Sequence, residues 1–234
     1  MRKITISLFL FFVLAANAQT DLQVLYDTGK GRDYWTTTVE MFKPDKWGTS
    51  YFFVDMYYNG GKDRHPSLAY TEISRCLKFW NGPLSAHVEY DGGLLSVGNS
   101  YLPINNAWLA GIDYGWHDQS FSKTFNLKLL YKTIEGKNAN SFQVTGVWNL
   151  NYFKNKMTLS GFADFWREDN VNFTNGNNEP ITPTNTKFVF ITEPQFWYNT
   201  TEHLSLGGEV QIASNFSTVN GLKVSPKIGA KWNF

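Results

Sequence analysis

The final residues of the chain, 222–234, alternate strictly between apolar and polar side chains. The apolar set consists of Val224, Pro226, Ile228, Ala230, Trp232 and Phe234, and the polar set of Lys223, Ser225, Lys227, Gly229, Lys231 and Asn233. A period of two that continues to the last residue is typical of a strand with lipid on one side and a polar interior on the other. Because open sheet edges do not occur in lipid, such a strand must close against another strand of the same sheet. We therefore predict a transmembrane β-barrel.

The N-terminal residues predict export. Arg2 and Lys3 precede an apolar run, 4–15, and a small-x-small cleavage site at 16–18. This is the pattern of a signal peptide, and the run is too short for a spanning helix. We expect 1–18 to be removed and 19–234 to form one barrel domain. The terminal Phe234 resembles the aromatic signature that the barrel-insertion machinery of bacteria reads, so we expect that machinery as a partner and the outer membrane of a Gram-negative bacterium as the location.

Composition excludes several other classes of protein. Aromatic residues make up 17% of the chain although the mean hydropathy is −0.33, a combination that suits alternating lipid-facing and water-facing side chains. Without Arg2 and Lys3 the chain has 19 basic residues (21 − 2) against 20 acidic ones, which argues against nucleic acid as a partner. Apart from 4–15, no apolar run approaches the about eighteen residues of a membrane helix. The single Cys76 cannot form an internal disulfide, and we expect neither a metal nor a cofactor.

Alternation and turn residues divide the mature chain into twelve segments. They are 21–29, 34–43, 48–58, 67–80, 84–92, 105–117, 121–134, 140–153, 157–168, 186–199, 204–215 and 222–234. We therefore predict an all-β, antiparallel up-and-down barrel of twelve strands, with ten as the alternative count. Short connections alternate with longer ones, as expected when both termini are periplasmic. Two of the longer connections are 93–106 and 168–184, and the second, rich in Asn, Pro and Thr, is expected to form a mobile surface lid.

Parity also separates the residues that face lipid from those that face the lumen. The residues that we expect to line the lumen and contact a solute are Phe53, Asp55, Tyr70, Glu72, His87, Glu89, Asp113, Phe162, Asp164, Trp166, Glu193, Trp197 and Glu209. The same face carries Glu40, Asp91, Lys128, Lys187, Lys227 and Lys231. Aromatic rings beside carboxylates can stack a planar solute and hydrogen-bond to its hydroxyls or amines. Plain interior packing of these aromatic rings is the alternative interpretation.

Arg75 does not fit the parity of its strand. Its position relative to Ile73 and Leu77 directs it towards lipid, where a charge at the midplane costs about 2–4 kcal/mol. Either a β-bulge shifts the register, which we prefer, or the side chain turns inward to pair with Glu72.

Four segments carry a resemblance to a known family. They are EMFKPDKWG at 40–48, SLAYTEISR at 67–75, NAWLA at 106–110 and GFADFWR at 161–167. They resemble an uncharacterised outer-membrane family grouped with the nucleoside-specific channel-forming (Tsx) proteins. The resemblance implies a monomeric twelve-stranded barrel in outer-membrane lipid that passes nucleosides through a narrow, aromatic-lined pore. Phe162, Asp164 and Trp166 best match a shared motif.

Three functions remain open. The first is a passive channel for small neutral solutes, with nucleosides as candidates. The second is a structural or ligand-binding barrel whose lumen is closed by salt bridges and whose outer loops bind a partner. The third is a lipid-modifying enzyme, which would need a Ser/His pair with an orienting group. His87 and Ser85 share one strand face but no triad is visible, so we expect no enzymatic activity.

Overall fold

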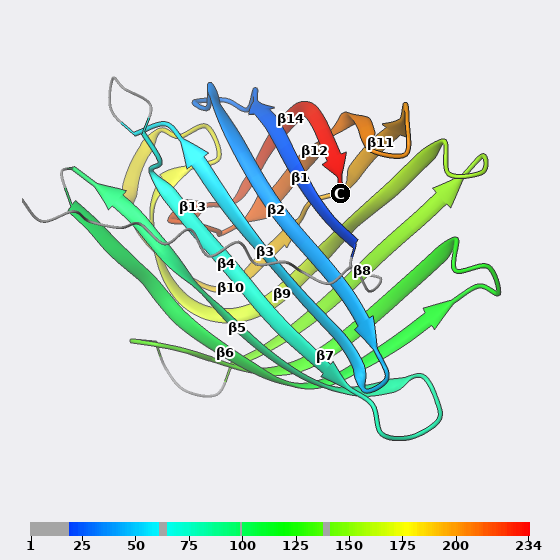
Figure 1. The fold of residues 1–234 in the computed structure, drawn as a ribbon. Helices are drawn as coiled ribbons and strands as arrows, with labels where there is room; N and C mark the ends of the chain where they lie inside the picture. The colour runs from blue at the N-terminus through cyan, green and yellow to red at the C-terminus, as the bar shows by residue number, and fades with distance from the viewer. Residues whose placement is uncertain (1–18, 61–64, 99, 138–140) are drawn as a thin grey trace, which may run out of the picture.

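The fold is a single closed β-sheet (Figure 1). The computed structural model describes residues 19–60, 65–98, 100–137 and 141–234, so the predicted signal peptide lies outside the described residues. No helix within these ranges is long and apolar enough to cross a membrane. The strands are β1 Gln19–Asp27, β2 Tyr34–Asp45, β3 Gly48–Tyr58, β4 Leu68–Leu77, β5 Leu84–Val97, β6 Ser100–His117, β7 Lys123–Ile134, β8 Ser141–Tyr152, β9 Met157–Asn175, β10 Pro180–Thr192, β11 Gln195–Asn199, β12 Leu204–Ser214, β13 Val219–Asn220 and β14 Leu222–Asn233.

These segments make a barrel of twelve antiparallel strands across the described ranges. β10 and β11 are two parts of one strand, interrupted at Glu193 and Pro194, since both pair with β9 on one side and with β12 on the other. The short β13 lies in the connection between β12 and β14 and pairs with the end of β9. β14 pairs with β12 and with β1, which closes the sheet. The predicted count of twelve and the predicted closure by the last strand are confirmed.

The two ends of the barrel differ. Gln19 and Phe234 lie at one, which we call the terminus end, where the backbone N–H of Phe234 donates to the carbonyl of Thr20 at 3.0 Å. The opposite, hairpin end carries the connections after β1, β3, β5, β7, β9 and β12. Connections at the terminus end are short turns.

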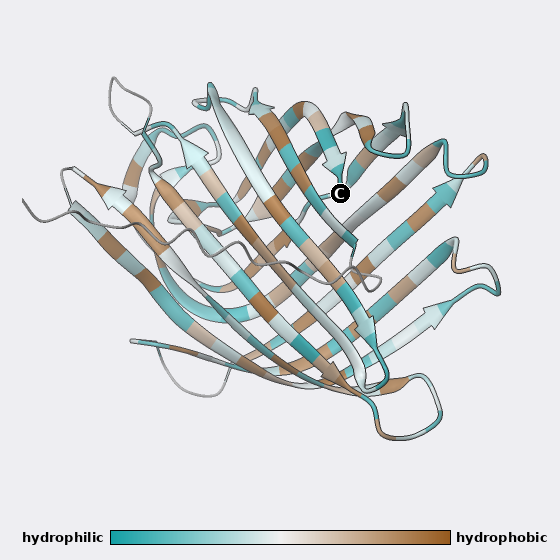
Figure 2. Cartoon of the chain, viewed as in Figure 1, coloured by the Kyte–Doolittle hydropathy of each residue, from teal (hydrophilic) through white to brown (hydrophobic). Residues whose placement is uncertain are grey.

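Hydropathy alternates along the strands, with brown and teal residues following one another in Figure 2. In β14, Ile228 is 65% exposed on the outer surface, whereas its neighbour Lys227 is 7% exposed inside. The same holds in β5, where Val88 is exposed and His87 and Glu89 are buried. An apolar outer surface and a polar interior are what a strand barrel in lipid requires. The interior therefore holds the candidate functional residues.

The two long connections predicted at 93–106 and 168–184 are instead extensions of strands. β5 and β6 continue to Val97 and from Ser100, and β9 and β10 continue to Asn175 and from Pro180. Alternation persists there, because Val171 and Phe173 are exposed while Asn172 between them is fully buried. The prediction that 168–184 is a long loop forming a surface lid is wrong, because most of this stretch pairs along the β9–β10 hairpin.

Arg75 stays on the outer face in unbroken register. It pairs opposite Ser50 of β3, and no bulge interrupts β4. The predicted bulge is therefore wrong, and so is the inward pairing with Glu72. The guanidinium instead contacts the Asp45 carboxylate at 2.8 Å and donates to the Ser50 hydroxyl at 2.9 Å. These partners lie at the terminus end of β2 and β3, so the charge avoids the apolar midplane.

Close packing of backbones at the closing seam gives a first prediction. A Cβ atom added to Gly229 would lie 2.0 Å from the Val24 carbonyl oxygen of β1, whereas one added to Gly146 would meet nothing within 4 Å. Gly229→Ala should therefore lower the free energy of unfolding by about 1–3 kcal/mol through overpacking. Urea unfolding in lipid vesicles measures it, with Gly146→Ala as the matched control. Equal behaviour of the two variants would show that the seam tolerates a side chain.

Candidate lumen site

The register places twelve of the thirteen predicted site residues on the inner face of the barrel, and a hydrogen bond from Gln211 places Glu193 there as well. Strand pairing shows which residues share this face. Asp55 lies opposite Tyr70, and Phe53 lies opposite Glu72. Gln195, two positions before Trp197 on the same face, lies opposite Glu209. On this face Trp197, His87, Glu89, Asp113, Asp164, Trp166 and Glu209 are buried. Phe53, Asp55, Tyr70, Glu72, Phe162 and Glu193 are half-buried. Whether these side chains bind a solute stays a prediction.

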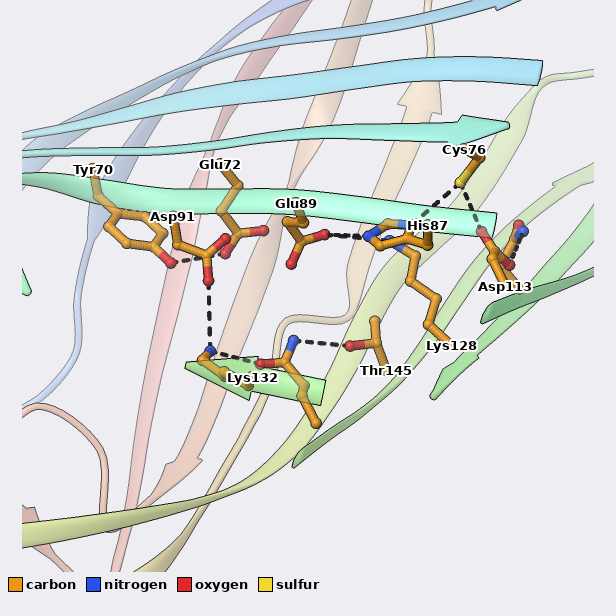
Figure 3. Close-up of polar contacts among 12 residues, drawn as sticks. Tyr70, Glu72, Cys76, His87, Glu89, Asp91, Asp113, Lys128, Lys132 and Thr145 are labelled. Atoms are coloured by element: carbon orange, nitrogen blue, oxygen red, sulfur yellow. Dashed lines mark hydrogen bonds and ion pairs between the residues drawn. The ribbon is translucent and has the colours of Figure 1, made fainter. Parts of the chain in front are cut away.

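A first chain of polar contacts, the β5 network, runs along β5 and its neighbours (Figure 3). His87 Nε2 lies 2.9 Å from a carboxylate oxygen of Glu89, and Lys128 lies 3.8 Å from the same oxygen. Further towards the hairpin end, Lys132 Nζ lies 3.5 Å from Asp91. The Tyr70 hydroxyl donates to Glu72 at 2.9 Å. The network therefore combines five strands, β4 to β8, through contacts of opposite charge and hydrogen bonds.

A second group, the β14 network, lies on the wall formed by β11, β12 and β14. Lys227 Nζ contacts Glu209 at 2.6 Å, and both side chains are about 95% buried, with 4% and 5% exposed. Gln195 donates to Glu209 at 2.9 Å, and the Trp197 indole N–H donates to Gln195 at 2.9 Å. Lys231 lies over the Trp197 ring at 4.6 Å. Trp197 is thus held by packing and by a hydrogen bond inside the wall.

Phe162 and Trp166, by contrast, contribute to an apolar cluster rather than to an open stacking slot. The cluster consists of Ile134, Phe162, Trp166, Val189, Ile191, Ala213 and Phe216. Phe216 comes from the connection between β12 and β14 and lies edge-on to Trp166, with ring centroids 6.1 Å apart. Phe162 and Trp166 are therefore packed inside the barrel, as the alternative interpretation held. Asp164, which lies between them in sequence, is buried and pairs opposite Thr145 of β8.

Carboxylates outnumber cationic groups on the inner face. The acidic side chains are Asp21, Asp27, Glu40, Asp55, Glu72, Glu89, Asp91, Asp113, Asp164, Glu193 and Glu209, and the basic ones Arg32, Lys128, Lys132, Lys223, Lys227 and Lys231. Lys187, predicted on this face, is exposed in the bulged part of β10. Two buried carboxylate oxygens, Asp91 Oδ1 and Asp164 Oδ1, have no hydrogen-bond partner within the described part of the protein. The interior is therefore rich in carboxyl groups and offers free hydrogen-bond acceptors.

The hairpin end contains a cavity of about 240 Å³. It is lined by Arg32, Thr174, Asn178, Gln211, Ala213, Phe216, Ser217, Thr218, Val219 and Lys223. The connection of residues 215–221 forms one side of it, and Asn215, Ser217 and Thr218 have positive φ angles of 56°, 52° and 65°. Because Phe216 belongs both to this wall and to the apolar cluster below, the connection narrows the lumen.

Sequence reasoning missed Phe216 and Cys76. Phe216 lies in a connection, where parity says nothing about direction. Cys76 is on the inner face of β4, and parity with Glu72 and Ser74 was a signal that could have found it.

Comparison with known families identifies the chain. The profile of a family described as "Domain of unknown function (DUF5020)" matches residues 18–234. The chain belongs to the DUF5020 family. No curated protein sequence matches it. The predicted membership of an uncharacterised family is thus confirmed. The further relationship of DUF5020 to the Tsx proteins stays a prediction.

Two solved structures similar to this DUF5020 chain are described as porins. The NanC porin has a TM-score of 0.57 at 11% identity, with 92% of this chain and 100% of that chain covered. The KdgM porin in complex with disordered oligogalacturonate has a TM-score of 0.50 at 11% identity, with 92% of this chain and 99% of that chain covered. At this identity the similarity concerns the fold, an antiparallel twelve-stranded barrel with the architecture of outer-membrane porins.

Proposed function

We propose that the protein is a passive outer-membrane channel that admits small neutral or cationic polar solutes and disfavours anions. The excess of inward carboxylates carries the proposal. Rings of acidic side chains favour cations in pores, because the field inside a low-dielectric wall attracts positive charge. The orphan oxygens Asp91 Oδ1 and Asp164 Oδ1 add acceptors for a solute that donates hydrogen bonds.

The topology supports one orientation in the membrane. Short turns at the terminus end and extended hairpins at the opposite end match the periplasmic and extracellular sides of bacterial barrels. The signal peptide predicted at 1–18 and the aromatic end of β14 would deliver the chain to the insertion machinery. The resemblance to nucleoside-specific channel-forming proteins implies a monomer, and β1 and β14 close the barrel within one chain.

The carboxyl groups of the lumen argue against acidic sugars as solutes of this chain. Oligogalacturonate, seen with the KdgM porin, is a polyanion, and the acidic inner face here would repel it. Nucleosides fit better, since they are uncharged, carry hydroxyl and amine donors, and have a planar ring. Phe53 and Tyr70, whose ring centroids are 6.0 Å apart beside Glu72, are the aromatic pair most suited to meet such a ring.

Planar-bilayer recordings with the purified protein test the proposal. In a KCl gradient, the reversal potential is expected to show preference for K⁺ over Cl⁻, and nucleosides are expected to reduce the current. Asp91→Asn combined with Asp164→Asn should lower the K⁺ preference, because both carboxylates face the lumen. Asp118→Asn, in the turn after β6 at the terminus end, is the matched control and should leave it unchanged. A preference for Cl⁻ over K⁺ would contradict the proposal. A current that nucleosides do not reduce would exclude nucleosides as the solute but leave the channel itself in place.

A closed barrel that acts through its hairpins is the second candidate. The buried Lys227–Glu209 pair and the Phe216 cluster favour it, because they fill the interior. It predicts no conductance in the same recordings. No contact of His87 among the described residues favours a lipid-modifying enzyme, since His87 contacts Cys76 and Glu89 rather than a serine.

A further inference from the structure

Three potential metal ligands from adjacent strands meet on the inner wall near the terminus end. They are Cys76 of β4, His87 of β5 and Asp113 of β6, all buried (Figure 3). Cys76 Sγ lies 3.2 Å from His87 Nδ1 and 3.3 Å from Asp113 Oδ2. One ligand atom from each residue lies within 4.8 Å of the others. The strand register brings them together, since Cys76 pairs opposite His87, and Asp113 lies diagonally beyond it.

The spacing suits one tetrahedral cation. Zinc binds thiolate sulfur at about 2.3 Å and imidazole nitrogen or carboxylate oxygen at about 2.0–2.2 Å, so two ligands on a tetrahedron are about 3.6 Å apart. The observed separations of 3.2 and 3.3 Å differ from this by a few tenths of an ångström. A small outward movement of the side chains would therefore accommodate the ion. Three protein ligands leave a fourth position for water.

The groups around the three ligands orient them as in known zinc sites. His87 Nε2, the nitrogen that would not bind metal, lies 2.9 Å from Glu89, so its N–H can donate to that carboxylate. Such carboxylate–histidine pairs fix the ring and strengthen the other nitrogen as a ligand. Asp113 Oδ1 accepts from the Asn126 amide at 2.8 Å, which leaves Oδ2 directed at Cys76. Both partners hold the ligands in a binding orientation.

The same cluster is poorly arranged for a cysteine nucleophile. Cys76 and His87 resemble a catalytic pair with Glu89 as the orienting group. However, the carboxylate of Asp113 lies 3.3 Å from the sulfur, and a thiolate there would face a second negative charge. A divalent cation between the two anions removes this repulsion. The ammonium of Lys128 contacts Glu89 at 3.8 Å rather than the sulfur.

We propose that Cys76, His87 and Asp113 bind one Zn²⁺ ion on the lumen wall. A thiolate, an imidazole and a carboxylate together suit Zn²⁺, whereas carboxylates alone would suit Mg²⁺ or Ca²⁺. The ion would tie β4, β5 and β6 together at the terminus end. The sequence did not lead us to expect a metal, because the ligands are far apart along the chain and Cys76 is the only cysteine.

Metal titration of the full mature protein in detergent, purified without a histidine tag, tests the proposal. Each chain should bind one Co²⁺ ion. The complex should show the intense near-ultraviolet band of a thiolate–cobalt bond and the visible bands of tetrahedral Co²⁺. Zn²⁺ should displace it and protect Cys76 from a thiol reagent. A cobalt spectrum without the thiolate band, or no protection of Cys76 by Zn²⁺, overturns the proposal with the wild-type protein alone.

Variants separate the ligands from their surroundings. Cys76→Ala should abolish the thiolate band, and Asp113→Asn should weaken Zn²⁺ binding while keeping the size of the side chain. Glu89→Gln, which keeps all three ligands and neutralises the partner of His87, should weaken Zn²⁺ binding about 10–100-fold. His117→Gln is the matched control, because this exposed histidine stacks on Phe121 in the β6–β7 turn. An equal loss in this control would show that Zn²⁺ binds elsewhere.

Discussion

Replacing Phe216 with alanine is expected to raise the single-channel conductance several-fold. The Phe216 ring reaches from the β12–β14 connection into the apolar cluster around Trp166, and the connection also lines the cavity at the hairpin end. Ion flow through a narrow pore is limited by its tightest section. Truncating a ring at that section removes the obstruction while leaving the carboxylates in place. Planar-bilayer recordings at a fixed salt concentration measure the change.

The K⁺ preference should change little in the same variant, because Phe216 carries no charge. Phe153→Ala provides the matched control, since this ring is 72% exposed in the β8–β9 turn at the terminus end. Folding of both variants is checked by their resistance to unfolding in detergent at room temperature. If Phe216→Ala folds and conducts like the wild type, the constriction lies at another level of the barrel. A second variant, Trp166→Ala, would then locate it.

Most of the barrel could be predicted from the sequence because parity repeats over many strands. A one-residue error in register would turn every side chain of a strand to the wrong face, so lipid and lumen select one register. The last strand illustrates this, as its alternation from Val224 to Trp232 agrees with the observed faces. The interruption of one strand at Glu193 and Pro194 was not predicted. Proline lacks the N–H that pairing needs, but Glu193 keeps its inward parity across the break.

The hairpin extensions escaped prediction for a different reason. Asn, Pro and Gly are weak strand formers in general, yet Asn172 is fully buried and donates to the Thr186 hydroxyl at 2.9 Å across the hairpin. Polar pairing inside a barrel satisfies such residues, so a composition typical of loops can form strands. The surroundings of Arg75 were not predicted either. The sequence shows which face Arg75 takes, but not how far it lies from the membrane midplane or that the β2–β3 turn brings Asp45 beside it.

The candidate site was predictable as a face but not as a set of partners. Parity directed Asp55, Glu72, His87 and Glu209 inward, and the structure agrees. The partner of each residue depends on the stagger between strands and on the closure of the barrel. Lys227 and Glu209 are 18 positions apart and meet because β12 and β14 pair. Phe162 and Trp166 had the right parity, yet the ring that covers them comes from a connection.

Replacing Lys227 with methionine should cost about 3–5 kcal/mol of unfolding free energy, because it leaves Glu209 buried without its cation. The ammonium contacts Glu209 at 2.6 Å and lies over the Tyr57 ring at 5.7 Å. The carboxylates of Glu193 and Asp55 also interact with it electrostatically. Without Lys227 these three acidic groups would face one another inside the barrel. Urea unfolding in lipid vesicles, followed by tryptophan fluorescence, measures the loss.

A second ion pair of similar length provides the control. Arg75 and Asp45 lie 2.8 Å apart, but on the outer surface beside a turn. Arg75→Ala should therefore lower the free energy of unfolding by no more than about 1 kcal/mol. The double variant Lys227→Met with Glu209→Gln should recover much of the loss, since it removes the uncompensated charge along with its partner. A small cost for Lys227→Met alone, together with no proton uptake by Glu209, would contradict a packed wall, because water around Glu209 would then have to screen that charge. The comparison therefore measures how dry the lumen is beside β14, the property on which the choice between a channel and a closed barrel depends.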